Sequence, residues 1–583
     1  MLLYRLLFES ETKGTEALFY RHTGGCKRAG AGLALADGAT VSFDTYFNSF
    51  SHAQYRKYCA LASVYLSLRG SGRFRLEIFH RSLKNKVTPV KSATFEGSTR
   101  EEIPLSSLPA DGYLFFTLTA LGEARLLSGG YESERVPAPV KVGIVICTFR
   151  REGFVKANLQ RMLAGLERAP ELRERLHIFI ADNARTLDLP ASDAYTVLPN
   201  PNLGGSGGFT RGIEEVCKDA SFTHFLLMDD DISFEFETIE RTLALLASLS
   251  PAYSGCTVGG AMLYLDRPTV QHEFGGYFSG IRFRQRNSLL DVSDPKNLLK
   301  NEAPKVPANY NAWWYCCMPA ATVQKYGLPM PFFIKGDDVE YGLRCTRQLI
   351  VMNGIAVWHQ DFSYKYNAAL EYYGHRNFAI VSAMHFHNSS LLLAYHLVYA
   401  VFSQLTQKRY FCAELILQAY RDFFRGCAFL RDTDMEQLNA EVMQCTPQYL
   451  TDAQLNEALG TQIEDFSAPL HGKPHKKNIL RKFLLASENF LPAFLFSRRA
   501  AIADANRNTA QAVFLHRTAV HYDRTRKAGY ICKLDTARRR KIRRETYKLF
   551  FKLLFGFGKM RREYRERYGI ACSEQAWQKK FDQ

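Results

Sequence analysis

The sequence predicts a multidomain α/β protein with an N-terminal β-sandwich or jelly roll, a central Rossmann-like domain and a C-terminal helical region. Three observations lead to this order. Alternating strand patterns fill residues 1–135, a β-loop-α pattern begins near residue 141, and amphipathic helical patterns follow residue 385. Because 583 residues are too many for one hydrophobic core, we assign domains to residues 1–135, 136–385 and 386–583.

The N-terminal region has the period of two that half-buried strands require. In VYLSLRGSGRFRLEIF, residues 64–79, apolar residues alternate on both sides of a Gly-Ser-Gly sequence, which predicts a hairpin turn there. The aromatic stretch FDTYFNSF, residues 43–50, has two interpretations: its rings stack on sugars, or they pack in a core. The prolines of VPAPV, residues 136–140, exclude a helix and predict a linker.

In the central region, apolar strands are followed by polar residues. VGIVIC, residues 142–147, precedes a helical pattern, and LHIFIAD, residues 176–182, ends on Asp182. An acid at a strand end suits the ribose or base of a nucleotide, although aspartate also caps helices and starts turns. The glycine run after Asn202 permits close approach of the backbone to a phosphate or another ligand, but it matches neither a Walker loop nor a dinucleotide fingerprint.

The segment HFLLMDDDISFE, residues 224–235, is an apolar run that ends in three carboxylates. It predicts a buried parallel strand whose acids lie at the ligand-binding edge of the sheet. Alternate residues of a strand point the same way, so Asp229 and Asp231 can reach one cation while Asp230 faces elsewhere. The pair would hold Mg²⁺ or Mn²⁺ together with the oxygens of a diphosphate. The alternative is a solvated acidic turn.

A second acid pair, Asp337 and Asp338, stands at the start of a predicted helix. Acids cap helices there, and a carboxylate can also act as a general base. The strand IAVWH ends on His359, which would join Asp229 and Asp231 as a metal ligand if the strands converge. His375 begins another helix together with an arginine and an asparagine, a combination suited to a diphosphate.

Two adjacent tryptophans, Trp313 and Trp314, follow in YNAWWYCCMP. Exposed indole rings form platforms for sugar faces, whereas buried ones form cores. The sequence alone leaves both interpretations open.

Composition restricts the class of protein. The hydrophobic content of 46% and the charged content of 23% are those of a globular protein, and a net charge of +17 indicates an anionic partner. Thirteen cysteines without paired spacing predict reduced thiols and a cytoplasmic location. The longest apolar stretch, residues 391–402, is too short to span a bilayer.

The tail, residues 538–567, combines a basic cluster with leucines and phenylalanines. Interfacial helices that bind anionic membranes have this composition, and a helical bundle with solvated charges is the alternative. We expect peripheral contact with the inner face of the cell membrane and a homo-oligomer. No nucleic-acid-binding motif is recognisable, so no nucleic-acid partner is expected.

An ordered set of motifs resembles the family 2 glycosyltransferases with a GT-A core, and in particular the bacterial polymerising galactofuranosyltransferases. The motifs are C-T-F-R at 147–150, A-D-N at 181–183, N-x-G-x-x-G-G at 202–208, D-D-D at 229–231, W-W-Y at 313–315, D-D-V-E-Y-G-L-R at 337–344, V-W-H at 357–359 and G-H-R-N at 374–377. That family also has an N-terminal β-sandwich with a D-T-Y-F-N motif, present here at 44–48.

The resemblance implies a role for each candidate residue. It places the uridine diphosphate part of the donor against Arg150, Asp182, Asn202, Asp230 and His375. It assigns a divalent metal, Mn²⁺ or Mg²⁺, to Asp229, Asp231 and His359, and the acceptor to Trp313 and Trp314. Asp337 becomes the base, with Asp338 supporting it. The family often has a tryptophan where this chain has Phe362, so acceptor preference can differ.

The expected function is therefore inverting, metal-dependent transfer of galactofuranose from UDP-galactofuranose to a lipid-linked glycan in the synthesis of a cell-surface polysaccharide. Transfer of rhamnose or another hexose is the alternative within the enzyme class, because one pocket residue can change donor selectivity. A non-catalytic glycan-binding protein is the alternative outside it, and the complete acid and histidine set favours the enzyme.

Overall fold

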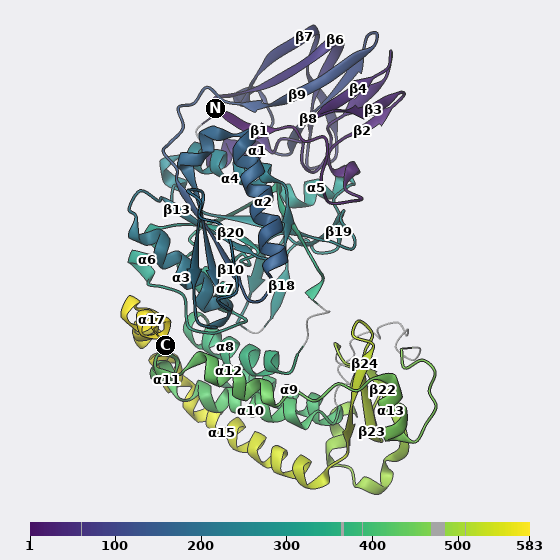
Figure 1. The fold of residues 1–583 in the computed structure, drawn as a ribbon, viewed down its shortest axis with the longest axis vertical. Coiled ribbons are helices and arrows are strands. Elements are labelled where there is room, and N and C mark those ends of the chain that lie inside the picture. The colour runs from purple at the N-terminus through teal and green to yellow at the C-terminus, as the bar shows by residue number, and fades with distance from the viewer. Residues whose placement is uncertain are drawn as a thin grey trace. The chain divides into compact units, whose positions relative to one another are not determined.

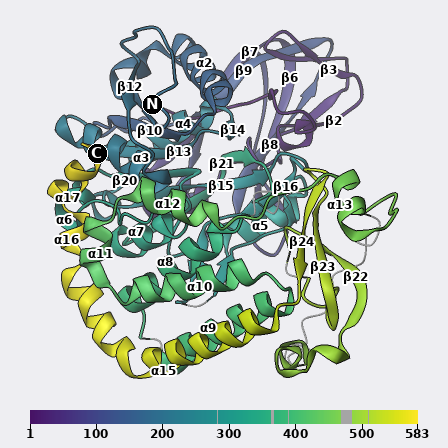
Figure 2. The ribbon, with the colours of Figure 1, turned by 60° about the horizontal axis from the view of Figure 1, so that its bottom comes forward.

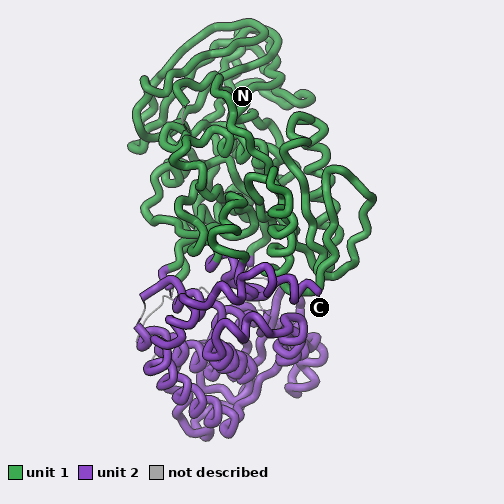
Figure 3. The backbone as a smooth tube through the Cα atoms, turned by 90° about the vertical axis from the view of Figure 1, so that its left-hand side faces the viewer, with its two compact units in different colours: residues 1–278, 282–328, 341–361 green, residues 279–281, 329–340, 362–583 purple. Residues whose placement is uncertain are grey.

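The computed structural model describes residues 1–59, 61–280, 282–362, 367–387, 389–467, 484–507 and 509–582. The chain forms two compact units, and Figure 3 shows them in separate colours. Unit 1 comprises residues 1–278, 282–328 and 341–361, and unit 2 comprises residues 279–281, 329–340 and 362–583. The N-terminal strands and the central sheet share unit 1, whereas the C-terminal helices form most of unit 2.

The N-terminal part of unit 1 is an antiparallel sheet in the order β2-β5-β8-β6-β9-β4-β3, with β1 paired to β9 and β7 paired to β6 (Figure 1). A short helix, α1 (His52–Tyr58), follows the aromatic stretch. The strands are β1 (Leu2–Arg5), β2 (Arg21–Thr23), β3 (Cys26–Ala29), β4 (Gly32–Leu35), β5 (Thr40–Ser42), β6 (Ser63–Arg81), β7 (Val87–Pro104), β8 (Tyr113–Ala120) and β9 (Ala124–Glu132).

The predicted hairpin turn in residues 70–72 is wrong. Strand β6 continues through these residues and exchanges its partner there, pairing with β9 over residues 65–71 and with β8 over residues 74–81. The glycines allow this because a Cβ at Gly70 would lie 2.4 Å from the Arg125 carbonyl oxygen, and Gly72 has a φ of +86°. The sequence therefore marks a bend within one strand.

The aromatic stretch 43–50 packs in a core. Phe43, Tyr46, Phe47 and Phe50 are fully buried. The Phe47 ring lies 5.6 Å from the ring of Trp358, which belongs to the central sheet, and both side chains lie in one hydrophobic cluster. The N-terminal sheet and the central sheet therefore share a core within unit 1, and the core interpretation of these aromatics is the one that the structure confirms.

The central sheet has the order β12-β11-β10-β13-β20-β15-β16-β19, with β21 paired to β15 and β14 paired to β21. Registers run parallel from β12 to β13 and between β15 and β21, while β20 is antiparallel to both β13 and β15. The carboxyl ends of β10, β11, β13 and β21 therefore lie at one edge. The bounds are β10 (Val142–Thr148), β11 (Leu176–Asp182), β12 (Tyr195–Pro199), β13 (His224–Asp229), β14 (Ser233–Phe234), β15 (Thr257–Tyr264), β16 (Val270–Glu273), β19 (Leu290–Asp291), β20 (Tyr315–Pro319) and β21 (Leu349–His359).

Helices cover this sheet and connect its strands. Three of them, α2 (Glu152–Arg168), α3 (Gly204–Lys218) and α4 (Phe236–Ser248), follow β10, β12 and β14. Helices α2 and α3 begin directly after polar loops at the carboxyl edge, and α4 follows β14. The loops after β10 and β13 therefore lie where a ligand would bind. The remaining elements are α5 (Pro295–Glu302), α6 (Ala321–Tyr326), α7 (Asp337–Cys345), β17 (Gly276–Phe278) and β18 (Phe283–Gln285).

Unit 2 is mainly helical, as the sequence predicts, and it also carries a small sheet that the sequence analysis did not anticipate. In Figure 2, the long helix α15 (Thr536–Arg567) runs along α9 (Ser390–Thr406) and α10 (Tyr410–Phe423). The small sheet contains β22 (Ser497–Asp504), β23 (His516–Asp523) and β24 (Ala528–Lys533). The other helices are α8 (Ala369–His385), α11 (Gly426–Asp432), α12 (Met435–Gln444), α13 (Asp452–Leu459), α16 (Gly569–Cys572) and α17 (Glu574–Phe581). Among the described residues, no helix is long and apolar enough to cross a membrane.

Candidate active site

Two strand ends bring three potential metal ligands together in unit 1. Asp229 ends β13, Asp231 follows two residues later, and His359 ends β21. Their nearest ligand atoms all lie within 4.8 Å of one another, and His359 Nε2 is 3.0 Å from Asp231 Oδ1. From the sequence, a shared site was expected only if these two strands converge, and their ends do converge.

The chemistry of this cluster suits a divalent cation. The His359 Nδ1 atom lies 2.5 Å from the backbone oxygen of Gln360, and the tautomer that donates its proton there has an unprotonated Nε2 that can bind a metal. Two carboxylates and one imidazole form a donor set that Mn²⁺ accepts readily, and Mg²⁺ binds chiefly through the carboxylates. With burial of 99% for His359 and 91% for Asp231, a cation between them would offset the cost of burying these charges.

Arg151 supplies the opposite charge at this edge of the sheet. Its Nη1 lies 2.9 Å from Asp230 Oδ1 and 2.8 Å from Asp231 Oδ2. Sequence reasoning selected the neighbouring Arg150 and missed Arg151. Arg150 adopts a φ of +55° and is exposed, so the chain reverses there and only the second arginine of the pair turns towards the acids. The two adjacent arginines after β10 were the sequence feature that could have indicated Arg151.

Asp230 points away from the metal cluster into the sheet edge. Its carboxylate accepts a hydrogen bond of 2.8 Å from Thr148 Oγ1 as well as the one from Arg151, and its backbone oxygen accepts one from Asn158. Burial raises the pKa of Asp230, and the nearby Arg151 opposes that shift. Asp230 thus ties β13 to the loop after β10, and its contact with a donor remains a prediction.

Asp182 and Asn202 lie in the neighbouring loops of the same edge. Asp182 is buried and accepts hydrogen bonds from the backbone N–H groups of Ala184 at 3.0 Å and Leu187 at 2.7 Å, which shape the loop after β11. Asn202 accepts a weaker bond of 3.3 Å from the Gly204 N–H at the start of α3. Both positions agree with the turn and cap interpretation and leave the nucleotide interpretation untested.

The glycine run that starts α3 has a packing role in the structure. A Cβ at Gly208 would lie 2.2 Å from Cys147 Sγ, and a Cβ at Gly212 would lie 2.1 Å from a Val145 methyl group. Helix α3 therefore packs directly against β10, which only glycine permits at these positions. The close packing of α3 on β10 thus explains these glycines without a ligand.

Trp313 and Trp314 are both buried, with 4% and 6% of their surface exposed. The Trp314 Nε1 donates a hydrogen bond of 3.1 Å to the Gly260 backbone oxygen, and the Trp313 ring packs edge-on against Phe209 at 5.2 Å. Both rings therefore pack in the core and form no exposed platform, and their role in acceptor binding remains a prediction.

Asp337 and Asp338 belong to unit 2, in the first turn of α7. Burial raises the pKa of Asp338 to about 6, and its carboxylate accepts a hydrogen bond of 2.8 Å from the Val339 N–H.

The two residues that follow His375 bind the backbone of the loop before α7. Arg376 donates to the Phe332 backbone oxygen, and Asn377 donates to those of Ile334 and Lys335. Arg376 and Asn377 thus have a structural role, and their predicted use for a diphosphate remains a prediction.

His375 also lies in unit 2, on α8, where its Nε2 is 3.4 Å from a Glu371 carboxylate oxygen. The structure thus brings Asp229, Asp231 and His359 together in one unit and places Asp337, Asp338 and His375 in the other. That all six form one site remains a prediction.

Comparison with known proteins defines the class of the central domain. Residues 139–373 match the model of the glycosyltransferase like family 2, and residues 19–134 match the model described as galactofuranosyltransferase 2 N-terminal. Residues 139–373 are therefore similar to family 2 glycosyltransferase domains, which agrees with the parallel strands β10 to β13 of the mixed sheet and the acids at its carboxyl edge.

The particular relatives are two curated proteins named galactofuranosyltransferase GlfT2. The protein from Mycolicibacterium smegmatis is 30% identical over 68% of this chain and 65% of its own length. The protein from Mycobacterium tuberculosis is 29% identical over 60% of each chain. The chain thus spans less than two thirds of the length of either relative.

Matches among solved structures are weaker. Mannosyl-3-phosphoglycerate synthase from Rubrobacter xylanophilus aligns over 41% of this chain and 73% of its own, with 15% identity and a TM-score of 0.26. A xylan-binding domain aligns over 23% of this chain and 94% of its own, with 12% identity and a TM-score of 0.15. These scores are too low to establish a shared fold.

Proposed function

We propose that this protein is an inverting, metal-dependent galactofuranosyltransferase that uses UDP-galactofuranose as donor and a lipid-linked glycan as acceptor. The observation that carries the proposal is the convergence of Asp229, Asp231 and His359 at the carboxyl edge of a family 2 glycosyltransferase sheet. The N-terminal match to galactofuranosyltransferase 2 and the two GlfT2 relatives support galactofuranose as the sugar.

The chain's own residues suggest how the reaction proceeds. When bound, a divalent cation neutralises charge on the leaving diphosphate. Asp229, Asp231 and His359 would hold it, and the Arg151 guanidinium lies beside them, 2.8 Å from Asp231. Asp337 would take the proton from the acceptor hydroxyl as this attacks the anomeric carbon from the face opposite UDP, which inverts the configuration.

The remaining site residues have supporting roles in the proposal. Asp182, Asn202, Asp230, Arg150 and His375 would contact the donor, and Trp313 and Trp314 would shape the acceptor site. Asp338 stands beside Asp337 in the first turn of α7, where the helix dipole favours a negative charge.

We further propose that α15 contacts an anionic membrane, where a lipid-linked acceptor would reside. Tyr547, Phe551 and Phe555 lie one turn apart on α15 with exposed fractions of 40%, 55% and 85%; we call them the aromatic row. Beside them lies a basic row, in which every side chain is exposed: Arg540, Arg544, Lys548, Lys552 and Lys559. Exposed aromatics next to cations are typical of interfacial helices. A homo-oligomer is also part of the proposal.

The release of UDP tests the activity. We would offer UDP-galactofuranose, UDP-galactopyranose and UDP-glucose to the full-length protein with a galactofuranosyl lipid acceptor, with Mn²⁺ and then with a chelator. Release from the furanose donor alone, dependent on metal and acceptor and abolished by Asp337→Asn, would support the proposal. Release from another donor would contradict galactofuranose as the sugar. Release that persists in the chelator would contradict the metal dependence.

A further inference from the structure

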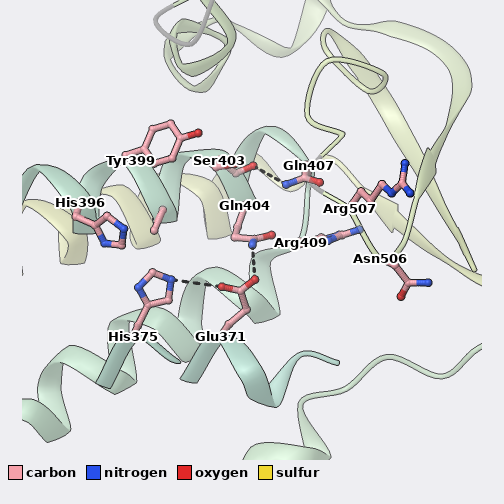
Figure 4. Close-up of a pocket in the computed structure, with 11 residues that line it drawn as sticks. Glu371, His375, His396, Tyr399, Ser403, Gln404, Gln407, Arg409, Asn506 and Arg507 are labelled. Carbon is pink, nitrogen blue, oxygen red and sulfur yellow. Dashed lines mark hydrogen bonds and ion pairs between the residues drawn. The ribbon is translucent and has the colours of Figure 1, made fainter. Parts of the chain in front are cut away.

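A polar cavity of 260 Å³ lies within unit 2, between α8, α9 and the loop after β22. Figure 4 shows Glu371 and His375 of α8 facing Gln404 and His396 of α9. Its volume is just below the range of about 300 to 1,000 Å³ that accommodates drug-sized ligands, so it suits a single sugar ring. Most of its lining residues lie beyond residue 373, outside the part of the chain that matches the glycosyltransferase family 2 model.

The wall from α8 and α9 offers a mixture of hydrogen-bond donors and acceptors. Gln404 is 93% buried, and its Nε2 donates to Glu371 Oε1 at 2.9 Å. The Gln404 Oε1 atom has no hydrogen-bond partner among the described residues, and the same holds for Asn506 Oδ1 across the cavity. Buried amide oxygens without partners are uncommon, and each of these two can accept a hydrogen bond from a hydroxyl group.

The charges around the cavity favour a neutral ligand. Glu371 places a carboxylate inside it, and burial, followed by the nearby His375, lowers the pKa of His396 to about 4, so that this ring is neutral near pH 7. The Arg409 guanidinium is already engaged, with Nη2 at 2.9 Å from His521 Nδ1 and 3.0 Å from the Ala505 oxygen. Arg507 is exposed and lies 3.8 Å from Asp504.

One aromatic ring completes the cavity. Tyr399, which Figure 4 shows beside His396, carries a hydroxyl at its tip and an apolar face on its ring. Aromatic faces pack against the C–H faces of sugars, while amides and carboxylates bind the hydroxyls. The Tyr399 ring, the Glu371 carboxylate and three amides together offer the contacts that a polyhydroxylated ring requires; the amides are those of Gln404, Gln407 and Asn506.

We propose that this cavity is a carbohydrate subsite that holds one sugar residue of the glycan acceptor or product. The inference rests on the proposed function, because it takes the glycan to be the second substrate. The cavity extends from His375 along α9 to Arg507, so a glycan bound in it would contact residues of unit 2 that the family 2 match does not include.

Calorimetric titration of the full-length protein with a lipid-free galactofuranosyl tetrasaccharide tests the subsite. Gln404→Met keeps the side-chain volume and removes the amide, and it should weaken tetrasaccharide binding about tenfold, the effect expected for losing hydrogen bonds to a buried group. The matched control is Gln437→Met on α12, an exposed glutamine that also bonds a glutamate and lies outside the cavity. It should bind like the wild type.

Three outcomes would overturn the subsite: no tetrasaccharide binding by the wild type, equal binding by Gln404→Met, or Gln404-dependent binding of pyrophosphate instead of the tetrasaccharide. UDP binding by Gln404→Met, measured in the same preparation, shows that the variant is folded. Failure of the proposed activity is separate. If the wild type binds the tetrasaccharide through Gln404 but releases no UDP, the result supports the subsite and contradicts the proposed activity. If it releases UDP but does not bind the tetrasaccharide through Gln404, only the subsite is contradicted.

Discussion

At the scale of single residues, the site depends on which way adjacent side chains point. The sequence identified the acids and His359 because strand ends are predictable from apolar runs and because side chains alternate along a strand. It could not identify Arg151 in preference to Arg150. That choice follows from the positive φ of Arg150, a conformation that non-glycine residues adopt rarely and that the pattern of apolar residues does not report.

Asp338 gives a prediction about pH at this scale. Its pKa is about 6 in the folded protein and about 3.9 in an unfolded chain, so the native state binds more protons between these values and loses stability as pH rises through this window. Asp338→Asn removes the titrating carboxyl group and keeps an acceptor for the Val339 N–H. The melting temperature of the variant relative to the wild type should therefore increase from about pH 4 to about pH 6 and then level off. A difference that does not change with pH would contradict the raised pKa.

Arg151 gives a second residue-scale prediction. Arg151→Ala leaves Asp230 and Asp231 without their cation, so we expect thermal stability to fall in the absence of metal and to recover when Mn²⁺ is added. The measurement is the melting temperature with and without Mn²⁺. Arg168→Ala, which removes an exposed partner of Glu237, is the control and should not change the metal-dependent shift.

At the scale of secondary-structure elements, the N-terminal sheet supports the strand that carries His359. Trp358, the residue before this ligand, packs on Phe47 and donates a hydrogen bond of 2.9 Å to the Pro268 backbone oxygen. Tyr4 also donates to the backbone oxygen of Asn353 in β21 at 2.8 Å. The N-terminal sheet thus helps to position the proposed metal site.

Phe47→Ala tests this support. Removing a fully buried phenylalanine should cost about 3 to 5 kcal/mol of unfolding free energy and also weaken Mn²⁺ binding, because β21 loses its packing partner. The matched control is Phe74→Ala in β6, which is equally buried but packs on Phe95 at 5.2 Å and lies outside the shared cluster. It should lower stability without changing Mn²⁺ affinity. Equal metal affinities in both variants would argue against the positioning role.

Elements also show where prediction from sequence ends. The strands β10, β11 and β13 were predictable because each is a continuous apolar run. The bend in β6 was mistaken for a turn because Gly-Ser-Gly is compatible with both, and the difference depends on the partners β8 and β9, which are distant in sequence. Strand β22 was missed because SRRAAIAD is mostly exposed and lacks the alternation that identifies a half-buried strand.

At the scale of the whole molecule, the structure shows where part of the net charge of +17 is concentrated. Part of it forms the basic row of α15 beside the aromatic row, so the exposed face of one helix carries both features of a membrane-binding surface. The sequence indicated this composition, but it could not separate the buried residues Leu549 and Leu553 from the exposed Phe551 and Phe555.

Liposome sedimentation tests the membrane proposal. The double variant Phe551→Ser/Phe555→Ser should bind vesicles containing anionic lipid at least about tenfold more weakly than the wild type, and wild-type binding should weaken as salt is raised. Phe154→Ser removes an aromatic side chain that is 50% exposed on α2 and serves as the control. Equal vesicle binding by the double variant and the wild type would contradict the proposed membrane contact of α15.

The central claim is that Asp229, Asp231 and His359 form the metal centre of a glycosyltransferase. Titration of the full-length protein with Mn²⁺, followed by electron paramagnetic resonance, tests it most directly. We predict one tight site in the wild type, a loss of at least about a hundredfold in affinity in Asp231→Asn and His359→Ala, and an unchanged site in the exposed control Glu167→Gln on α2. Wild-type Mn²⁺ binding that survives in both ligand variants would contradict the assignment.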